Sequence, residues 1–168
     1  MRLGDNVRKI EMNFITQTVK ELAMDANCNI GKSFIDELRE ALKKEKSAIG
    51  KNVIEQIIEN DTIAMENREP MCQDTGLVVV FVELGYDVHL EGDLYDAINE
   101  GIRQAYHEGF LRKSVAKHPI TRGNTNDNTP GIIHIKLVPG DKIKITLAPK
   151  GGGSEYMSLV KMLVPSDG

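Results

Sequence analysis

The sequence is poor in cysteine and tryptophan, and it has no strongly basic tract. Its 168 residues include two Cys, no Trp, four Tyr and four Phe. Lys and Arg number 21 against 25 Asp and Glu, which gives a formal net charge of −4. A nucleic-acid-binding domain usually carries a basic stripe or an aromatic stacking platform, so these shortages argue against that function.

Long apolar runs are also missing. No run approaches the roughly 20 residues of a membrane-spanning helix, and the N-terminus lacks the apolar region of a signal peptide. We therefore expect a cytoplasmic location. The composition is 40% hydrophobic and 27% charged, which is typical of a globular protein in water. The length fits one domain over residues 1–168.

The two cysteines, Cys28 and Cys72, are too few for a self-contained metal site. No C-x-x-C or C-x-x-H pair is present, so the usual zinc spacing is absent. A disulfide between the two is disfavoured in a reducing compartment. Cys28 follows a predicted helix, and because Cys is often buried we interpret it as a packing residue rather than a ligand.

Apolar spacing predicts four long helices and three strands. The helices are expected at residues 7–26, 32–47, 52–67 and 94–109. Residues 77–84 form a short β-branched run that is typical of a buried strand. Residues 131–138 and 142–148 alternate around Pro139-Gly140-Asp141, which predicts a hairpin with one buried face. The expected fold is α+β, with an N-terminal helical layer packed on a small mixed or antiparallel sheet and a C-terminal β-hairpin.

The most informative segment directly precedes the buried strand. It reads Pro70-Met71-Cys72-Gln73-Asp74-Thr75-Gly76. Cys72 can ligate a metal or cluster, Gln73 can donate and accept hydrogen bonds, and Asp74 can accept them or carry a proton. The same residues also suit an ordinary turn, with Asp74 bonded to nearby backbone and Cys72 packed as a small hydrophobe. Residue types alone leave both interpretations open.

Two later segments contain groups that can bind an anion. Residues 111–130 form a polar loop of about 20 residues, a length that is uncommon unless the loop is functional or disordered. Its Arg112 suits a two-pronged contact to a carboxylate, although a plain surface arginine is the alternative. Residues 150–154 join Lys150 and three glycines to a helix expected at residues 155–163, with Ser154 as its cap. Such a loop can bind an anion, but it can equally be a hinge or linker.

Together the segments resemble the α-type portion of the iron–sulfur hydro-lyases, class I fumarate hydratase and L-tartrate dehydratase. The resemblance covers nearly the whole chain, and its motifs occur in the family's order. They are Pro70-Met71-Cys72-Gln73-Asp74-Thr75-Gly76, Leu111-Arg112-Lys113-Ser114-Val115, Asn124-Thr125-Asn126-Asp127-Asn128-Thr129-Pro130 and Lys150-Gly151-Gly152-Gly153-Ser154-Glu155.

The resemblance implies reversible hydration of a dicarboxylate, with fumarate and malate the first expectation and tartrate the next. It implies a 4Fe–4S cluster held by three cysteines, whose open iron acts as a Lewis acid. Cys72 matches the first cluster ligand, and Arg112 matches the arginine that grips a substrate carboxylate. Gln73 and Asp74 match substrate-contacting positions, and Asp74 is the candidate catalytic residue. Further substrate-binding residues are implied at Lys150, Gly151, Gly152, Gly153 and Ser154.

The sequence also departs from the family pattern. The other two cluster cysteines lie beyond the glycine-rich loop, and Tyr156 stands where the family has Asn. The resemblance therefore implies the N-terminal part of an α subunit, inactive alone, with the α remainder and a β-type subunit as partners in a homo- or hetero-oligomer. Two alternatives remain: a non-catalytic interaction module with the same fold, and a phosphate-ligand binding domain that uses the Gly151–Gly153 loop.

Overall fold

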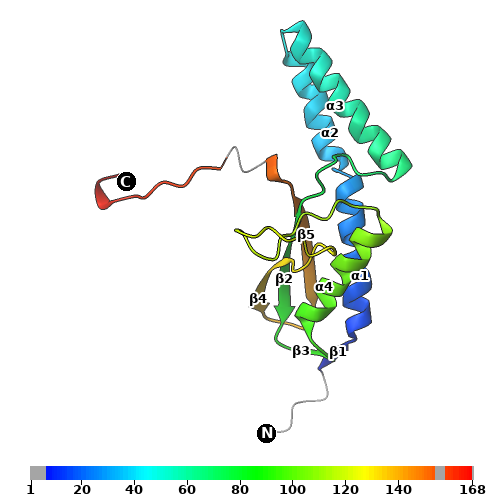
Figure 1. Cartoon of the computed structure of the whole chain (residues 1–168), viewed down its shortest axis with the longest axis vertical. Coiled ribbons are helices and arrows are strands. Elements are labelled where there is room, and N and C mark those ends of the chain that lie inside the picture. The colour runs from blue at the N-terminus through cyan, green and yellow to red at the C-terminus, as the bar shows by residue number, and fades with distance from the viewer. Residues whose placement is uncertain (1–6, 154–157, 168) are drawn as a thin grey trace.

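The computed structural model describes residues 7–153 and 158–167, and it has the expected α+β architecture. Two helices cover one face of a small sheet, and a helical hairpin projects beyond them (Figure 1). The elements in chain order are β1 (Arg8–Ile10), α1 (Met12–Cys28), α2 (Lys32–Lys44), α3 (Ala48–Asn67), β2 (Leu77–Gly85), β3 (Val88–Leu90), α4 (Leu94–Glu108), β4 (Ile132–Val138), β5 (Ile143–Lys150) and a short 3₁₀ turn, η2 (Pro165–Asp167).

The core lies between β2 and the helices α1 and α4. Successive side chains of a strand point to opposite faces, so Val78, Val80 and Val82 share one face of β2. All three are buried, with exposures of 1% or less. The helices contribute their own buried stripes, which consist of Ile15, Val19, Ala23, Ile98, Ile102, Ala105 and Tyr106. The predicted strand at 77–84 and the predicted core face of α4 are therefore confirmed.

The predicted hairpin is wrong, because β4 and β5 do not pair with each other. The strand order is β4-β2-β5, with β2 parallel to β4 and antiparallel to β5. The expected turn instead crosses the end of β2, where Gly85 N–H donates to the Lys142 carbonyl at 2.9 Å. Turn chemistry specifies that the chain reverses its direction, but it does not specify that the two strands are neighbours. The strongly apolar β2 takes the place between them.

Several helix predictions also differ from the structure. Residues Arg8–Ile10 form β1, a strand parallel to β3, so the first helix begins only at Met12. Helix α3 begins at Ala48, because the Ser47 side chain caps it by accepting from Gly50 N–H at 3.3 Å. The short helix expected at 155–163 is absent from residues 158–163. Residues 154–157, which include Ser154, lie outside the described part of the chain.

The α2–α3 hairpin is the part of the fold that carries no core. None of the residues of α2 is buried, and Ile49 of α3 is 78% exposed. The apolar residues predicted to face the core from these helices are therefore exposed or half-buried, except for Ala64, which is buried. No helix within residues 7–153 and 158–167 is both long and apolar enough to cross a membrane.

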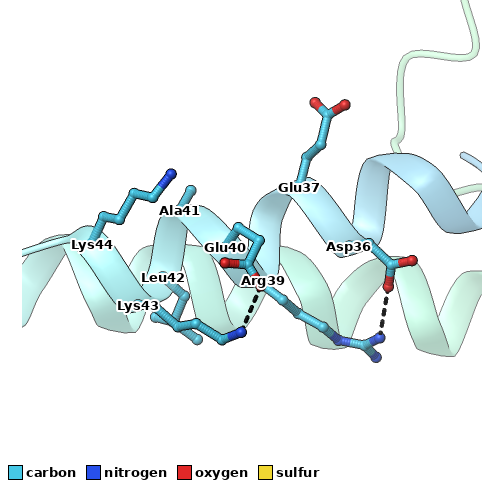
Figure 2. Close-up of a pocket in the computed structure, with 8 residues that line it drawn as sticks. All are labelled: Asp36, Glu37, Arg39, Glu40, Ala41, Leu42, Lys43 and Lys44. Atoms are coloured by element: carbon cyan, nitrogen blue, oxygen red, sulfur yellow. Dashed lines mark hydrogen bonds and ion pairs between the residues drawn. The ribbon is translucent and has the colours of Figure 1, made fainter.

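A surface hollow of about 880 Å³ lies along α2 and is lined by α2 residues alone. Figure 2 shows that it carries mixed charges, with ion pairs between Lys43 and Glu40 and between Arg39 and Asp36. Exposed pairs of this kind contribute little to stability. This face is a solvated surface, and it contains none of the candidate site residues.

The turn between β4 and β5 crosses the end of β2 next to Gly85. This contact predicts that alanine at Gly85 lowers the stability much more than alanine at Gly123. A Cβ at Gly85 would lie 2.1 Å from the Gly140 carbonyl oxygen, whereas one at Gly123 would meet nothing within 4 Å. We expect Gly85→Ala to lower the free energy of unfolding by about 2–3 kcal/mol through steric overlap. Gly123→Ala should change it by less than about 0.5 kcal/mol. Chemical denaturation measures both, and equal losses would contradict the crossing.

Candidate functional site

The Cys72 loop, residues 70–76, is fixed at its C-terminal end by buried hydrogen bonds. The Tyr106 hydroxyl donates to the Thr75 carbonyl at 2.7 Å and to the Gly76 carbonyl at 3.2 Å. Burial raises the pKa of Tyr106 to about 12, so this phenol stays a donor at neutral pH. Gly76 has a φ of +68°, and a Cβ there would lie 2.3 Å from the Lys150 carbonyl carbon. Only glycine fits this position.

Asn128 ties the polar loop of residues 111–130 to the same point. Its side chain is fully buried. The Nδ2 group donates to the Gly76 carbonyl at 3.1 Å, while Oδ1 accepts from the N–H groups of Ser114 and Val115 at 2.7 and 3.2 Å. Thr75 adds a bond from its hydroxyl to the Arg112 carbonyl at 2.9 Å. These bonds hold the backbone of Arg112 beside the Cys72 loop.

Asp74 connects three of the predicted segments. Its Oδ1 accepts from Gly76 N–H at 3.1 Å and from Arg112 Nη1 at 3.3 Å. Its Oδ2 accepts from Gly152 N–H at 2.8 Å. The Gly152 N–H bond, with Gly76 and Arg112 in support, lowers the pKa of Asp74. An ionised carboxylate that already accepts three hydrogen bonds suits an organising role better than that of a proton carrier.

Cys72 is exposed. It lines a pocket of about 370 Å³ together with Gln73 and Arg112. It also lines a second pocket, of about 270 Å³, together with Asp74 and Gly151. The alternative of a Cys72 packed in the interior is therefore wrong.

Cys28, by contrast, ends α1 and is half-buried, and burial raises the pKa of its thiol. A raised thiol pKa is typical of an unreactive cysteine, because the thiolate is the form that binds metals. Within the described residues, no three His, Cys, Asp or Glu side chains gather to hold a metal ion. The described chain thus offers one accessible thiol, Cys72, which fits a contribution of one ligand rather than a whole cluster site.

The remaining predicted residues lie around this centre. Lys150 is the last residue of β5 and pairs in register with Leu77. Gly151 lies against Asp74, since a Cβ there would be 3.3 Å from the Asp74 Oδ2 atom. The structure thus brings the Cys72 loop, Arg112 and the glycine loop together. Which of these residues contact substrate stays a prediction.

Sequence reasoning missed the anchoring roles of Tyr106 and Asn128. Tyr106 was predicted as an apolar core residue, and its hydroxyl gave no sign of a partner about 30 residues earlier in the chain. Asn128 has a φ of +62°, a left-handed conformation that Asn tolerates better than most residues. An Asn-rich loop signals such conformations, but it does not reveal which Asn is buried.

Loss of the Asn128 side chain should release the polar loop. Asn128→Ala leaves the N–H groups of Ser114 and Val115 without their partner and removes one of the two side-chain bonds to the Gly76 carbonyl, so we expect the free energy of unfolding to fall by about 2–4 kcal/mol. Asn126→Ala is the matched control, because Asn126 also has a positive φ of 68° but is exposed. The control should lose about 1 kcal/mol or less. Similar losses in denaturant titrations would show that Asn128 is no anchor.

The lowered pKa of Asp74 predicts a pH-dependent contribution to stability. The folded state holds the carboxylate ionised, so this contribution is present above the unfolded pKa of about 4 and is lost as the pH falls through the lower folded value. The stability difference between wild type and Asp74→Asn should therefore be largest near neutral pH and shrink under acid. Thermal unfolding between pH 7 and pH 3 measures it, and a difference independent of pH would contradict this arrangement.

Comparison with known proteins agrees with this arrangement. The family described as fumarate hydratase (Fumerase) matches residues 16–168. The "Putative L(+)-tartrate dehydratase subunit alpha" of Methanocaldococcus jannaschii is 40% identical over 161 residues, which cover 92% of this chain and 56% of that protein. The L(+)-tartrate dehydratase subunit alpha of Escherichia coli K12 is 24% identical over 169 residues, 99% of this chain and 56% of the relative.

This chain therefore spans about half the length of the curated relatives that it matches. The family match covers most of the chain, including all the segments that converge on Asp74. The chain belongs to the fumarate hydratase (Fumerase) family.

Proposed function

We propose that this chain forms part of the active site of a 4Fe–4S-dependent hydro-lyase, which reversibly adds water to or removes it from a dicarboxylate. Fumarate and malate are the first candidates and tartrate is the next. The observation that carries the proposal is the convergence on Asp74 of Arg112 and the Gly152 N–H, with the exposed thiol of Cys72 beside them. Family membership and the names of the relatives support the same chemistry.

Arg112 and the glycine loop are suited to hold the two carboxylates of such a substrate. A guanidinium has five N–H donors, so the contact from Nη1 to Asp74 leaves donors for a substrate carboxylate. The Arg112 side chain is 62% exposed, which makes these donors accessible. The glycine loop and the charge of Lys150 can bind the second carboxylate through groups other than the Gly152 N–H, which Asp74 already occupies. Gln73 lines the same pocket as Arg112 and can donate to either group.

Asp74 and Cys72 have different parts in the proposal. Asp74 orients Arg112 and the glycine loop while no substrate is present, and its proposed catalytic role is to keep them aligned. Cys72 is the one cluster ligand that we assign to this chain. When bound, the cluster supplies a Lewis acid for the substrate hydroxyl and carboxylate. The other two cluster cysteines would come from outside these 168 residues.

The proposed enzyme needs further protein. The relatives are named as alpha subunits, and this chain spans about half of their length. We therefore propose that the active assembly, located in the cytoplasm, contains the remainder of an α subunit and a β-type partner. This chain alone should be inactive.

The alternative of a phosphate-binding loop is disfavoured by one contact. The Gly152 N–H already bonds the ionised Asp74, whose negative charge would repel a phosphate at the same position. A carboxylate substrate bears less charge per group than a phosphate does, and Arg112 is placed to offset it.

Anaerobic reconstitution of the complete assembly with iron and sulfide tests the proposal. Wild type should give a brown cluster and turn over fumarate, malate or tartrate, whereas Cys72→Ser should lose cluster absorbance and activity by more than about tenfold. Cys28→Ser is the matched control and should keep both. The proposal fails if the complete wild-type assembly forms but has neither cluster nor activity, or if Cys72→Ser retains them.

A further inference from the structure

Phe110 has a backbone conformation that its residue type disfavours. It follows the C-cap residue Gly109 of α4 and has a φ of +52°. Its N–H donates to the His107 carbonyl at 3.4 Å, which closes the last turn of the helix. Helices commonly end on a left-handed residue at this position, and that residue is usually Gly or Asn because a Cβ causes strain there.

Packing does not explain why a phenylalanine occupies this position. Phe110 is 92% exposed, whereas the next residue, Leu111, is 3% exposed and belongs to the core. Leu111 thus supplies the apolar contact that fixes the end of α4, and a glycine at position 110 would end the helix with less strain. Strained residues persist mainly where function requires the side chain.

The ring of Phe110 lies where it would be useful to a bound dicarboxylate. It lines the pocket of about 370 Å³ that also contains Cys72, Gln73 and Arg112. A dicarboxylate has charged ends and an apolar carbon chain, so its site needs an apolar wall between the anion-binding groups. Phe110 and Pro70 are the apolar side chains of this pocket.

We propose that Phe110 is a positioning residue, whose ring forms the aromatic wall of the dicarboxylate pocket beside Arg112 and excludes water from the substrate's carbon chain. The assignment rests on the proposed function. The left-handed residue at the end of α4 is also a lining residue of this pocket, and we interpret its strain as the cost of placing a phenylalanine there. Phe110 does not itself bind the carboxylates or move a proton.

The first test separates stability from substrate binding in the complete assembly. Phe110→Gly should raise the melting temperature by relieving strain, while it increases KM for the dicarboxylate about tenfold and changes kcat less. Phe110→Leu, which keeps an apolar side chain, should recover part of the KM. Tyr86→Ala is the control, because Tyr86 is 64% exposed but is absent from the pocket, and it should leave KM unchanged.

The second test needs no enzyme activity. In the 168-residue chain with Cys28→Ser, only Cys72 can react with iodoacetamide. Because the ring borders the pocket that holds Cys72, Phe110→Gly should speed alkylation several-fold, and Tyr86→Ala should not.

The outcomes distinguish this inference from the proposed function. Unchanged KM and unchanged alkylation with Phe110→Gly would overturn the inference. Weaker subunit assembly with an unchanged KM in the fraction that still assembles would also overturn it, because it would identify the ring as a partner contact. If wild type turns over no dicarboxylate, the proposed function fails, and the alkylation rates still decide whether Phe110 borders the pocket as argued.

Discussion

The site depends on the hydrogen bonds that two buried side chains make to the backbone at the start of β2. Tyr106 donates to the carbonyls of Thr75 and Gly76, and Asn128 donates to Gly76. Tyr106 belongs to helix α4 and Asn128 to the polar loop, so both elements are held at the same point. An unpaired buried carbonyl is costly, which makes these partners hard to replace. The Cys72 loop is therefore ordered by the core.

The same anchoring positions the charged groups of the site. Once Gly76 is fixed, Asp74 can accept from Gly76 N–H, Arg112 and Gly152 N–H together. One carboxylate thereby aligns a cation and a glycine loop that lie far apart in the sequence. Binding groups aligned before the ligand arrives lose less conformational entropy when it binds. An exposed thiol, that of Cys72, lines pockets together with Arg112 and Asp74, and in the proposed function it would be a cluster ligand.

Local patterns in the sequence predict the local parts of this structure. The strand at 77–84 and the helix at 94–109 are found close to their predicted bounds, because apolar spacing acts within a few residues. The order β4-β2-β5 and the short strand β1 were missed, because they depend on pairing between distant segments. The loop residues were identified by their chemistry and by resemblance, whereas the roles of Tyr106 and Asn128 depend on burial, which the sequence does not show.

The central claim is that the thiol of Cys72 provides one corner of an iron–sulfur site next to Arg112. Anomalous diffraction at the iron edge, from anaerobically grown crystals of the complete assembly with a bound dicarboxylate, tests it most directly. The account predicts an iron peak at bonding distance from the Cys72 sulfur, about 2.3 Å for a metal–thiolate bond, with a substrate carboxylate on the Arg112 guanidinium. An iron peak elsewhere, with the Cys72 sulfur unligated, would contradict it.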